Sequence, residues 1–504
     1  MEKLDLAIRG GSVVLPDEVR RMDVGIRAGR IVKLGDIAAD EAKEAVDARG
    51  LHVMAGMIDV HVHLNEPGLG DWEGFESGSA ALAAGGCTAY LDMPLNGIPP
   101  TVTVRALERK LAAAKGRSVV DYGCWGGLVP GRLDELEPLA AAGVVGFKAF
   151  MSAPGDPSEE AFREVDDATL LEGMKRIARL GKVLALHAES EPIVARLTAE
   201  ARERLRSRPG GGKFVGGEFR VGTSAADYSA TRPVEAELEA VRRALRFARE
   251  TGCPLHFVHI SSAAAVAAIR AAKEEGMDVT LETCPHYLTL TEDDLGRLGS
   301  VAKCAPPLRS EAERDRLWEE IRAGRIDMIS SDHSPCPTSM KTGDLLEAWG
   351  GISGAQSSLE LMIDEGVGRR GLTLPQISRL LSSAPAKRFG LYPDKGEIAV
   401  GSHADLALVD LSAGYTLEAG DLYYRHKHSP YVGRSFSCRV AATYSRGRLV
   451  YRLGEGVFPA VAEEAAGAAG PEGAAGAGQW LRAGGRPVAA PGFRDDRAAR
   501  GRSL

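Results

Sequence analysis

The sequence predicts an α/β protein: a (β/α)8 barrel of the TIM type with a small β-sandwich domain that both ends of the chain build together. Short apolar runs alternate with helix-length amphipathic segments through the middle of the chain, which is the pattern of repeated βα units around a parallel sheet. Eight such runs can be counted, and eight strands can close a barrel. Short strand-like runs at both ends, punctuated by glycine, indicate the second domain.

The first part of the β domain is expected in residues 1–55. Apolar and polar residues alternate there in short runs such as Leu4–Ile8, with glycines between the runs. The same pattern returns in Gly396–Val409 and in Val440–Tyr451. We therefore expect residues 391–457 to complete the domain.

The barrel is expected in residues 56–390. Helical segments separate most of its apolar runs, for example Glu235–Arg249, Ala263–Glu275 and Glu311–Ala323. The predicted strands are Met57–His63, Thr88–Asp92, Val119–Trp125, Val145–Phe150, Val183–His187, Leu255–His259, Asp278–Thr283 and Ile326–Ser331.

Two segments depart from this pattern. The connection from His187 to Cys253 is too long for one helix, and its break at Pro209–Gly212 predicts an extra loop or lid. The tail, residues 458–504, includes the Ala/Gly-rich stretch Ala465–Gly478. Such a composition buries little apolar surface, so we expect the tail to be disordered.

Composition narrows the functional classes. The 504 residues are 44% hydrophobic and 26% charged, which is ordinary for a globular chain with a packed core. A net charge of -7 argues against a nucleic-acid partner, which usually requires a basic face. The seven cysteines are scattered without a CxxC pair, as in a reduced, cytosolic protein. We expect no membrane segment, because no apolar run reaches 18 residues, and no secretion signal, because the first residues lack its layout.

Polar residues follow the ends of five predicted strands. In an α/β barrel these carboxyl ends gather at one mouth, where catalytic groups lie. Imidazoles and carboxylates are ligands for divalent metals, although a bare His-x-His pair also fits surface or packed histidines. It is the convergence of several strands that favours a metal site. The residues are His61, His63, Lys148, His187, His259 and Asp332.

Lys148 stands out among these residues because it lies between Phe147 and Phe150 on a predicted core strand. A surface lysine with an apolar stem is one interpretation. The other is a desolvated amine, which loses its charge easily. From the residues alone we can infer only that the pKa of the Lys148 amine is lowered.

Longer motifs resemble those of the cyclic amidohydrolases, metal-dependent enzymes that open cyclic amides. The resemblance covers about residues 1–455 and is closest to the branch whose substrate is allantoin. The matching stretches are Asp59–Gly68 with Trp72–Phe75, Met93–Thr101, Gly146–Met151, His187–Glu189, His259–Ser262, Glu282–Leu288, Lys303–Arg309, Ser331–Cys336, Ala348–Gly354 and Lys427–Tyr431.

The resemblance implies two divalent metal ions, with zinc expected and cobalt, manganese, nickel or iron as alternatives. His61, His63 and Asp332 would hold one ion, and His187 and His259 the other. Lys148, carboxylated by CO2 to N6-carboxylysine, would bridge them. A metal-activated hydroxide would attack the ring carbonyl, with Asp332 as the catalytic base.

Substrate choice depends on small departures within this family. Dihydroorotases carry an arginine for the substrate carboxylate at the position of Asn65, so a neutral ring such as allantoin fits better here. Asn65 and Asn96 could bind its ureido arm, or they could only cap loops. Other substrate contacts are expected from Cys304, Ala305 and Gly351. The alternative is a hydantoinase or dihydropyrimidinase, although those enzymes lack the sequence motifs found here in Asn65–Gly68 and Met93–Asn96.

Several other readings stay open. His286, His333 and Tyr287 could orient metal ligands or simply be packed, whereas His256 reads as core or surface. Cys336 reads as a packed or loop cysteine rather than a nucleophile. A non-catalytic barrel would show loss of ligands, but all six positions are present. The resemblance also suggests a cytoplasmic homotetramer in purine degradation.

Overall fold

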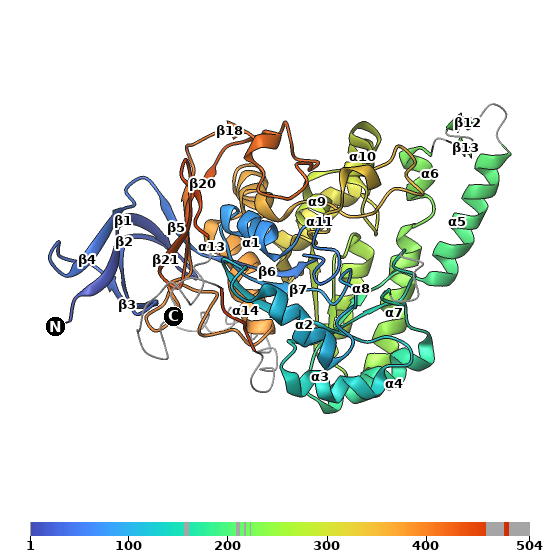
Figure 1. Cartoon of the computed structure of the whole chain (residues 1–504), viewed down its shortest axis with the longest axis horizontal. Coiled ribbons are helices and arrows are strands. Elements are labelled where there is room, and N and C mark those ends of the chain that lie inside the picture. The colour runs from blue at the N-terminus through green and yellow to red at the C-terminus, as the bar shows by residue number, and fades with distance from the viewer. Residues whose placement is uncertain are drawn as a thin grey trace, which may run out of the picture.

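The computed structural model describes residues 2–155, 161–207, 212–215, 218–221, 223–459 and 478–482. A parallel barrel lies beside a β-rich domain (Figure 1). In Figure 1 the first strands of the chain (blue) lie next to strands from near its other end (red), on the side of the molecule away from α5 (Glu191–Arg206). No helix among the described residues is long and apolar enough to cross a bilayer.

The β-rich domain draws strands from both ends of the chain, which confirms that part of the predicted fold. They belong to one mixed sheet in which β5 joins the halves, parallel to β1 and antiparallel to β17. The strands are β1 (Leu4–Val14), β2 (Val19–Arg27), β3 (Arg30–Gly35), β4 (Ala42–Asp47), β5 (His52–Ala55), β17 (Leu406–Asp410), β20 (Arg439–Ser445), β21 (Arg448–Arg452) and β22 (Gly456–Val457).

The eight predicted barrel strands are all present, most of them shorter than predicted. They are β6 (Met57–Val62), β7 (Cys87–Asp92), β8 (Asp121–Cys124), β10 (Phe147–Phe150), β11 (Leu184–His187), β14 (Leu255–Phe257), β15 (Val279–Thr283) and β16 (Met328–Ile329), with the short β9 (Gly126–Gly127) beside β10. Two backbone contacts close the ring: Val145 N donates to Cys124 O (3.0 Å), and His63 N donates to His333 O (2.8 Å). Apolar side chains of successive strands form a continuous buried cluster that holds the strand ends in place.

Helices pack around the strands, as the amphipathic segments predicted. Local caps explain where two of them begin: Ser262 Oγ accepts from Ala265 N, and Ser310 Oγ accepts from Glu313 N. The helices are α1 (Phe75–Ala84), α2 (Val104–Ala114), α3 (Leu136–Ala142), α4 (Asp167–Arg179), α5, α6 (Ala225–Ser229), α7 (Val234–Thr251), α8 (Ala263–Glu274), α9 (Pro285–Thr289), α10 (Glu292–Leu298), α11 (Glu311–Arg322), α12 (Ser358–Leu361), α13 (Leu374–Ser378) and α14 (Ala384–Arg388).

The long connection after β11 contains α5, a hairpin of β12 (Gly212–Val215) and β13 (Glu218–Val221), α6 and α7. Figure 1 shows α5 and the hairpin projecting from the barrel. The predicted loop or lid starts in residues 209–211, which lie outside the described residues.

Residues 421–437, here called the closing segment, connect the β domain to the mouth of the barrel. Its His428 Nε2 lies 2.8 Å from Cys336 O, and Ser429 Oγ donates to Ser353 O (2.6 Å). Both acceptors lie in the connection that follows β16. The β domain therefore helps to hold a loop at the candidate site.

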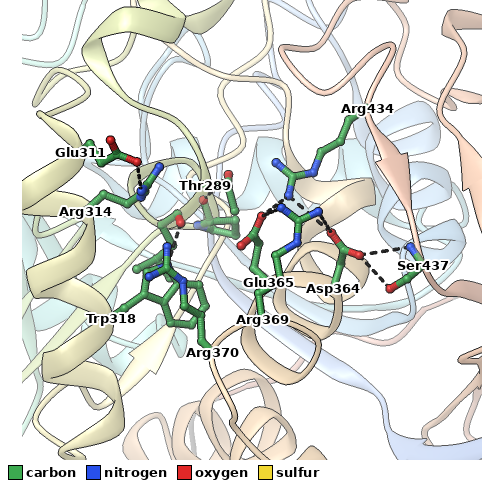
Figure 2. A network of polar contacts seen from close by, with 12 residues as sticks. Thr289, Glu311, Arg314, Trp318, Asp364, Glu365, Arg369, Arg370, Arg434 and Ser437 are labelled. Carbon is green, nitrogen blue, oxygen red and sulfur yellow. Dashed lines mark hydrogen bonds and ion pairs between the residues drawn. The ribbon is translucent and has the colours of Figure 1, made fainter.

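The closing segment is anchored at its other end on a π-helical turn, η5 (Met362–Val367). Figure 2 shows that Arg434 reaches both acidic side chains of this turn, next to Arg369: Arg434 Nη2 lies 2.5 Å from Glu365 Oε1 and 3.5 Å from Asp364 Oδ2. Ser437 Oγ donates to Asp364 Oδ1 (2.7 Å). Through these contacts Arg434 and Ser437 link the closing segment to the turn and so to the barrel.

A short piece of the tail, residues 478–482, runs parallel to β8. Tyr122 N donates to Gln479 O (3.0 Å), and Leu481 N donates to Tyr122 O (2.7 Å). Gln479 N also donates to Asp121 Oδ1 (2.7 Å). The prediction of a disordered tail did not anticipate these contacts. Its other residues, 460–477 and 483–504, lie outside the described residues.

We expect these contacts to stabilise the barrel. A chain that ends at residue 477 should melt about 2 °C below the full chain, because it loses several strand hydrogen bonds and the packing of Leu481. A chain that ends at residue 482 keeps those contacts and is the matched control. Differential scanning calorimetry of both chains makes the comparison, and equal melting temperatures would show that the contacts add nothing.

Candidate functional site

Five of the six predicted metal ligands line one cavity at the carboxyl ends of the barrel strands. His61 lies in β6 and His63 directly follows it, whereas His187 is the last residue of β11. His259 follows β14 by two residues and Asp332 follows β16 by three. Because these strands run parallel around one barrel, their carboxyl ends meet, and residues far apart in the sequence converge here.

The first group in this cavity consists of His61, His63 and Asp332, whose ligand atoms all lie within 4.8 Å of one another. Asp332 Oδ1 is 3.2 Å from His61 Nε2 and 3.4 Å from His63 Nε2. Burial alone would raise the pKa of the Asp332 carboxyl, but His61 and His63 hold it at about 2. Asp332 also has a positive φ of 46°, a strained conformation that is common at functional sites.

The second group consists of His187 and His259. His187 Nδ1 lies 2.9 Å from His259 Nε2, and the His187 ring stacks on Phe150 with 4.5 Å between centroids. Burial lowers the pKa of both imidazoles, which therefore stay neutral, the form that binds metals. The rings of His259 and His61 are 5.5 Å apart, so the two groups adjoin.

Lys148 lies in β10, fully buried, and does not line the cavity itself. Its Nζ has no hydrogen-bond partner among the described residues and lies 5.0 Å from the centre of the Phe150 ring. Burial lowers the pKa of this amine from 10.5 to about 7, against the attraction of Asp332 and Glu282. The structure therefore places an unpartnered, easily neutralised amine next to both groups.

Two buried carboxylates orient the histidines, and sequence reasoning missed this role for both. Glu282 Oε1 lies 2.6 Å from His61 Nδ1, and Glu282 Oε2 lies 3.1 Å from His256 Nε2. Burial alone would raise the pKa of Glu282, but these histidines hold it well below its usual range. His256, read from the sequence as core or surface, is buried and supports this carboxylate.

Glu189 is the carboxylate that orients His187 in the second group. Its Oε2 lies 2.9 Å from His187 Nε2 and also accepts from Arg232 Nη1. Burial alone would raise the pKa of Glu189, but Arg232 and His187 hold it at about 2. Glu189 stands two residues after His187, a spacing that could have pointed to its role but was not used.

The other histidines near the mouth play different parts. His333 contributes its backbone carbonyl to His63 N, and its Nδ1 accepts from Gly354 N (3.3 Å). His286 is buried, and its Nε2 has no partner among the described residues. Tyr287 donates to Pro306 O (2.6 Å) and so supports the loop that follows η2 (Gly299–Ala302).

The predicted substrate-binding residues divide into two sets. Asn96, Ala305 and Gly351 line the cavity. Asn65 is buried behind it, where its Nδ2 donates to Pro335 O (3.2 Å) and its Oδ1 accepts from Asn96 Nδ2 (3.1 Å). Cys304 also lies behind the cavity, and its carbonyl accepts from Tyr228 (2.7 Å).

Three further lining residues that carry a side-chain hydrogen-bond donor were not predicted as substrate contacts. They matter because they supply donors and bulk next to the two histidine groups. These residues are Arg232, Ser334 and Trp349, whereas Gly350, which also lines the cavity, belongs to the stretch where backbone contacts were expected.

Comparison with known proteins agrees with this geometry. A sequence model described as the amidohydrolase family matches residues 52–450. An allantoinase from Deinococcus radiodurans is 50% identical over 453 residues, which are 90% of this chain and 96% of the relative. An allantoinase from Escherichia coli is 42% identical over 456 residues, which are 90% of this chain and 96% of that relative.

Solved structures with the same fold carry other names. An L-hydantoinase (dihydropyrimidinase) from Arthrobacter aurescens has a TM-score of 0.84 and 36% identity, and the match covers 90% of this chain and 98% of that one. A dihydropyrimidinase from Brevibacillus agri has a TM-score of 0.81 and 29% identity, with 96% and 99% covered. These neighbours confirm the predicted fold class.

Proposed function

The chain belongs to the amidohydrolase family, and we propose that its barrel site hydrolyses the hydantoin ring of allantoin to give allantoate. The observation that carries this proposal is 50% identity to an allantoinase across 90% of the chain. It is supported by the convergence of the histidines, Lys148 and Asp332 at the barrel mouth. A non-catalytic role is disfavoured, since every proposed ligand is in place.

The donor chemistry of the site fits two divalent cations. In three of the histidines, one ring nitrogen is already hydrogen-bonded to the protein. His61 Nδ1 bonds Glu282, His63 Nδ1 bonds Leu95 O (3.1 Å), and His187 Nε2 bonds Glu189. The opposite nitrogens remain for metal, as in metal sites where carboxylates orient imidazoles.

The proposed ligand sets follow the two groups. His61, His63 and Asp332 would hold one cation, and His187 and His259 the other. Nitrogen and oxygen donors of this kind accept zinc, cobalt, manganese, nickel or iron, and we propose zinc.

Lys148 is proposed to bridge the cations as N6-carboxylysine. Its neutral amine would form a bond to the carbon of CO2 and release one proton, which leaves a carbamate with two oxygens. The lowered pKa and the unpartnered Nζ support this modification, because both make the free amine available.

In the proposed reaction Asp332 transfers a proton. When bound, the cations lower the pKa of water toward about 7 and polarise the ring carbonyl. Asp332 takes the proton of the attacking water and delivers it to the ring nitrogen that departs, as a general base and then a general acid. One C–N bond breaks, one C–O bond forms, and the product carries a carboxylate.

Substrate choice is proposed to depend on the neutral side chains of Asn65 and Asn96, since the Arg232 guanidinium on the cavity wall is already paired with Glu189. Asn65 carries no charge, and its amide is already bonded to Asn96 and Pro335. Asn96, which lines the cavity, would therefore meet the ureido arm, while the backbone near Ala305 and Gly351 would meet the ring. The alternative, a hydantoinase or dihydropyrimidinase, is supported by solved neighbours at 36% and 29% identity, below the 50% of the allantoinase relative.

The test is product analysis. Protein loaded with zinc and bicarbonate should convert allantoin to a product heavier by one water, and a chelator should stop the conversion. Unchanged allantoin in the presence of bound metal would reject the proposed function. By resemblance we also propose a cytoplasmic homotetramer that serves purine degradation, and the described cysteines, all of them free and buried, agree with a reducing compartment.

The orienting role of Glu282 makes a separate prediction. Glu282→Gln removes the charge that holds His61 and should weaken metal binding about 10- to 100-fold. Glu360→Gln is the matched control, because Glu360 is a buried carboxyl that bonds Tyr415 and Val440 far from the cavity. Competition with a chromophoric chelator measures both affinities. Equal affinities in the two variants would contradict the role of Glu282.

A further inference from the structure

One wall of the cavity is a loop without regular secondary structure, Ala348–Gly351, of which Trp349, Gly350 and Gly351 line the cavity. The loop is packed tightly against its neighbours. Gly351 N donates to Lys303 O (2.8 Å), and a Cβ at Gly351 would lie only 2.3 Å from Ser334 O. Its backbone position is therefore narrowly defined.

Two lysines bind the carbonyls of this loop. Lys303 Nζ donates to Ala348 O, and Lys341 Nζ donates to Trp349 O (3.1 Å) and to Gly351 O (2.5 Å). Three of the four carbonyls in Ala348–Gly351 thus accept from an amine. Gly350 O is the one that these lysines leave free.

Lys303 is buried and Lys341 is half-buried, yet neither has the carboxylate partner that a lysine away from solvent usually has. Among the described residues, no carboxylate forms an ion pair with Lys303 or Lys341. Burial lowers the pKa of Lys303 to about 7 and that of Lys341 to about 8, so the environment does not stabilise the charges. In return the amines gain the three carbonyls, and Lys303 Nζ also lies 4.9 Å from the centre of the Tyr228 ring. The orientation of the three carbonyls is the feature that needs an explanation.

The geometry of the peptide group explains why the orientation of these carbonyls matters. In a trans peptide the C=O of one residue and the N–H of the next point in opposite directions. With Trp349 O turned toward Lys341, the N–H of Gly350 points away from that amine. Trp349 N–H is already bonded to Met340 O (3.0 Å), whereas Gly350 lies on the cavity wall.

We propose that Lys303 and Lys341 are positioning residues, which set the Ala348–Gly351 backbone so that Gly350 N–H donates to a carbonyl oxygen of the bound cyclic amide. This inference rests on the proposed function, because it concerns the same cavity. Neither lysine touches the substrate. Each acts through the loop, so it should govern how well the ring is bound and aligned.

The test uses Lys341→Met and Lys303→Met, which keep the length of the side chain but remove its donors. Losing the hydrogen bonds to the loop carbonyls should raise KM for allantoin about 10- to 100-fold. We expect kcat to fall less than KM rises, with metal content unchanged. The double variant should be less than additive, because both lysines hold one loop.

The matched control is Lys182→Met. Lys182 Nζ also donates to a backbone carbonyl, Val144 O (3.0 Å), and burial also lowers its pKa. Lys182 and Val144 precede β11 and β10, so this bond lies at the opposite end of the barrel from the cavity. Lys182→Met should therefore lower the melting temperature to a similar degree while KM stays at the wild-type value.

Lys341→Arg keeps donors at the same place and should bring KM back toward the wild-type value. It also keeps the inference testable if Lys341→Met does not fold. The outcomes separate two failures. Wild-type protein that does not hydrolyse allantoin would overturn the proposed function. Wild-type turnover with the same KM in Lys303→Met, Lys341→Met and Lys182→Met would overturn the role of the lysines alone.

Discussion

Lys148→Ala should abolish allantoin hydrolysis, with a loss of more than about a thousandfold in kcat, because both proposed cations lose a shared ligand. The buried, unpartnered Nζ of Lys148 is the structural basis for this expectation. Elemental analysis should find less bound metal in the variant than in the wild type. Wild-type protein prepared without CO2 should behave in the same way and recover on addition of bicarbonate.

A second readout does not depend on turnover. Lys148→Met replaces an unpartnered buried amine by an apolar side chain of similar length, so the metal-free protein should be as stable as the wild type or more so. Loss of activity together with retained stability would identify a functional rather than a structural lysine. A Lys148→Ala variant that keeps both its metal and its turnover would contradict the bridging role.

Asp332→Asn is the second variant with a large expected effect. It preserves the shape of the side chain but cannot take up a proton as the carboxylate does, so kcat should fall about 10²- to 10⁴-fold. Asp364→Asn is the control, because Asp364 is a buried carboxylate in the π-helical turn of Figure 2 rather than in the cavity. Steady-state kinetics and metal content should be measured together. Full turnover by Asp332→Asn would require another base.

Most of the barrel could be predicted from the sequence because its strands are near-continuous apolar runs. Met57–Val62 and Leu255–Phe257 are buried along their whole length, so an apolar run and a strand coincide. The same logic placed His187 and Asp332 at one mouth, since every parallel strand ends there.

The contacts between strands could not be predicted in this way. Glu282 and His61 are 221 residues apart, and only the order of the sheet brings them together. Asn65 was expected to reach the substrate, but its amide is used by Asn96 and Pro335, a choice that depends on loop geometry. Asn96 remains the polar side chain of this pair that lines the cavity.

The tail shows a different limit. Its Ala/Gly-rich composition is an average over the whole tail and predicts little burial. Trp480 and Leu481 nevertheless give one short piece enough apolar surface to pack on the barrel. Composition cannot resolve a piece of that length. The loop formed by Ala348–Gly351 was similarly visible as a motif, but not the two lysines that hold its carbonyls.

The measurement that tests the central claim most directly is kcat/KM for four rings, namely allantoin, hydantoin, dihydrouracil and dihydroorotate, with protein loaded with zinc and bicarbonate. Our account predicts that allantoin exceeds the others by about 100-fold or more, because position 65 carries a neutral asparagine and Asn96 offers a polar side chain to the ureido arm. A preference for hydantoin or dihydrouracil would contradict it and would assign the site to the alternative function.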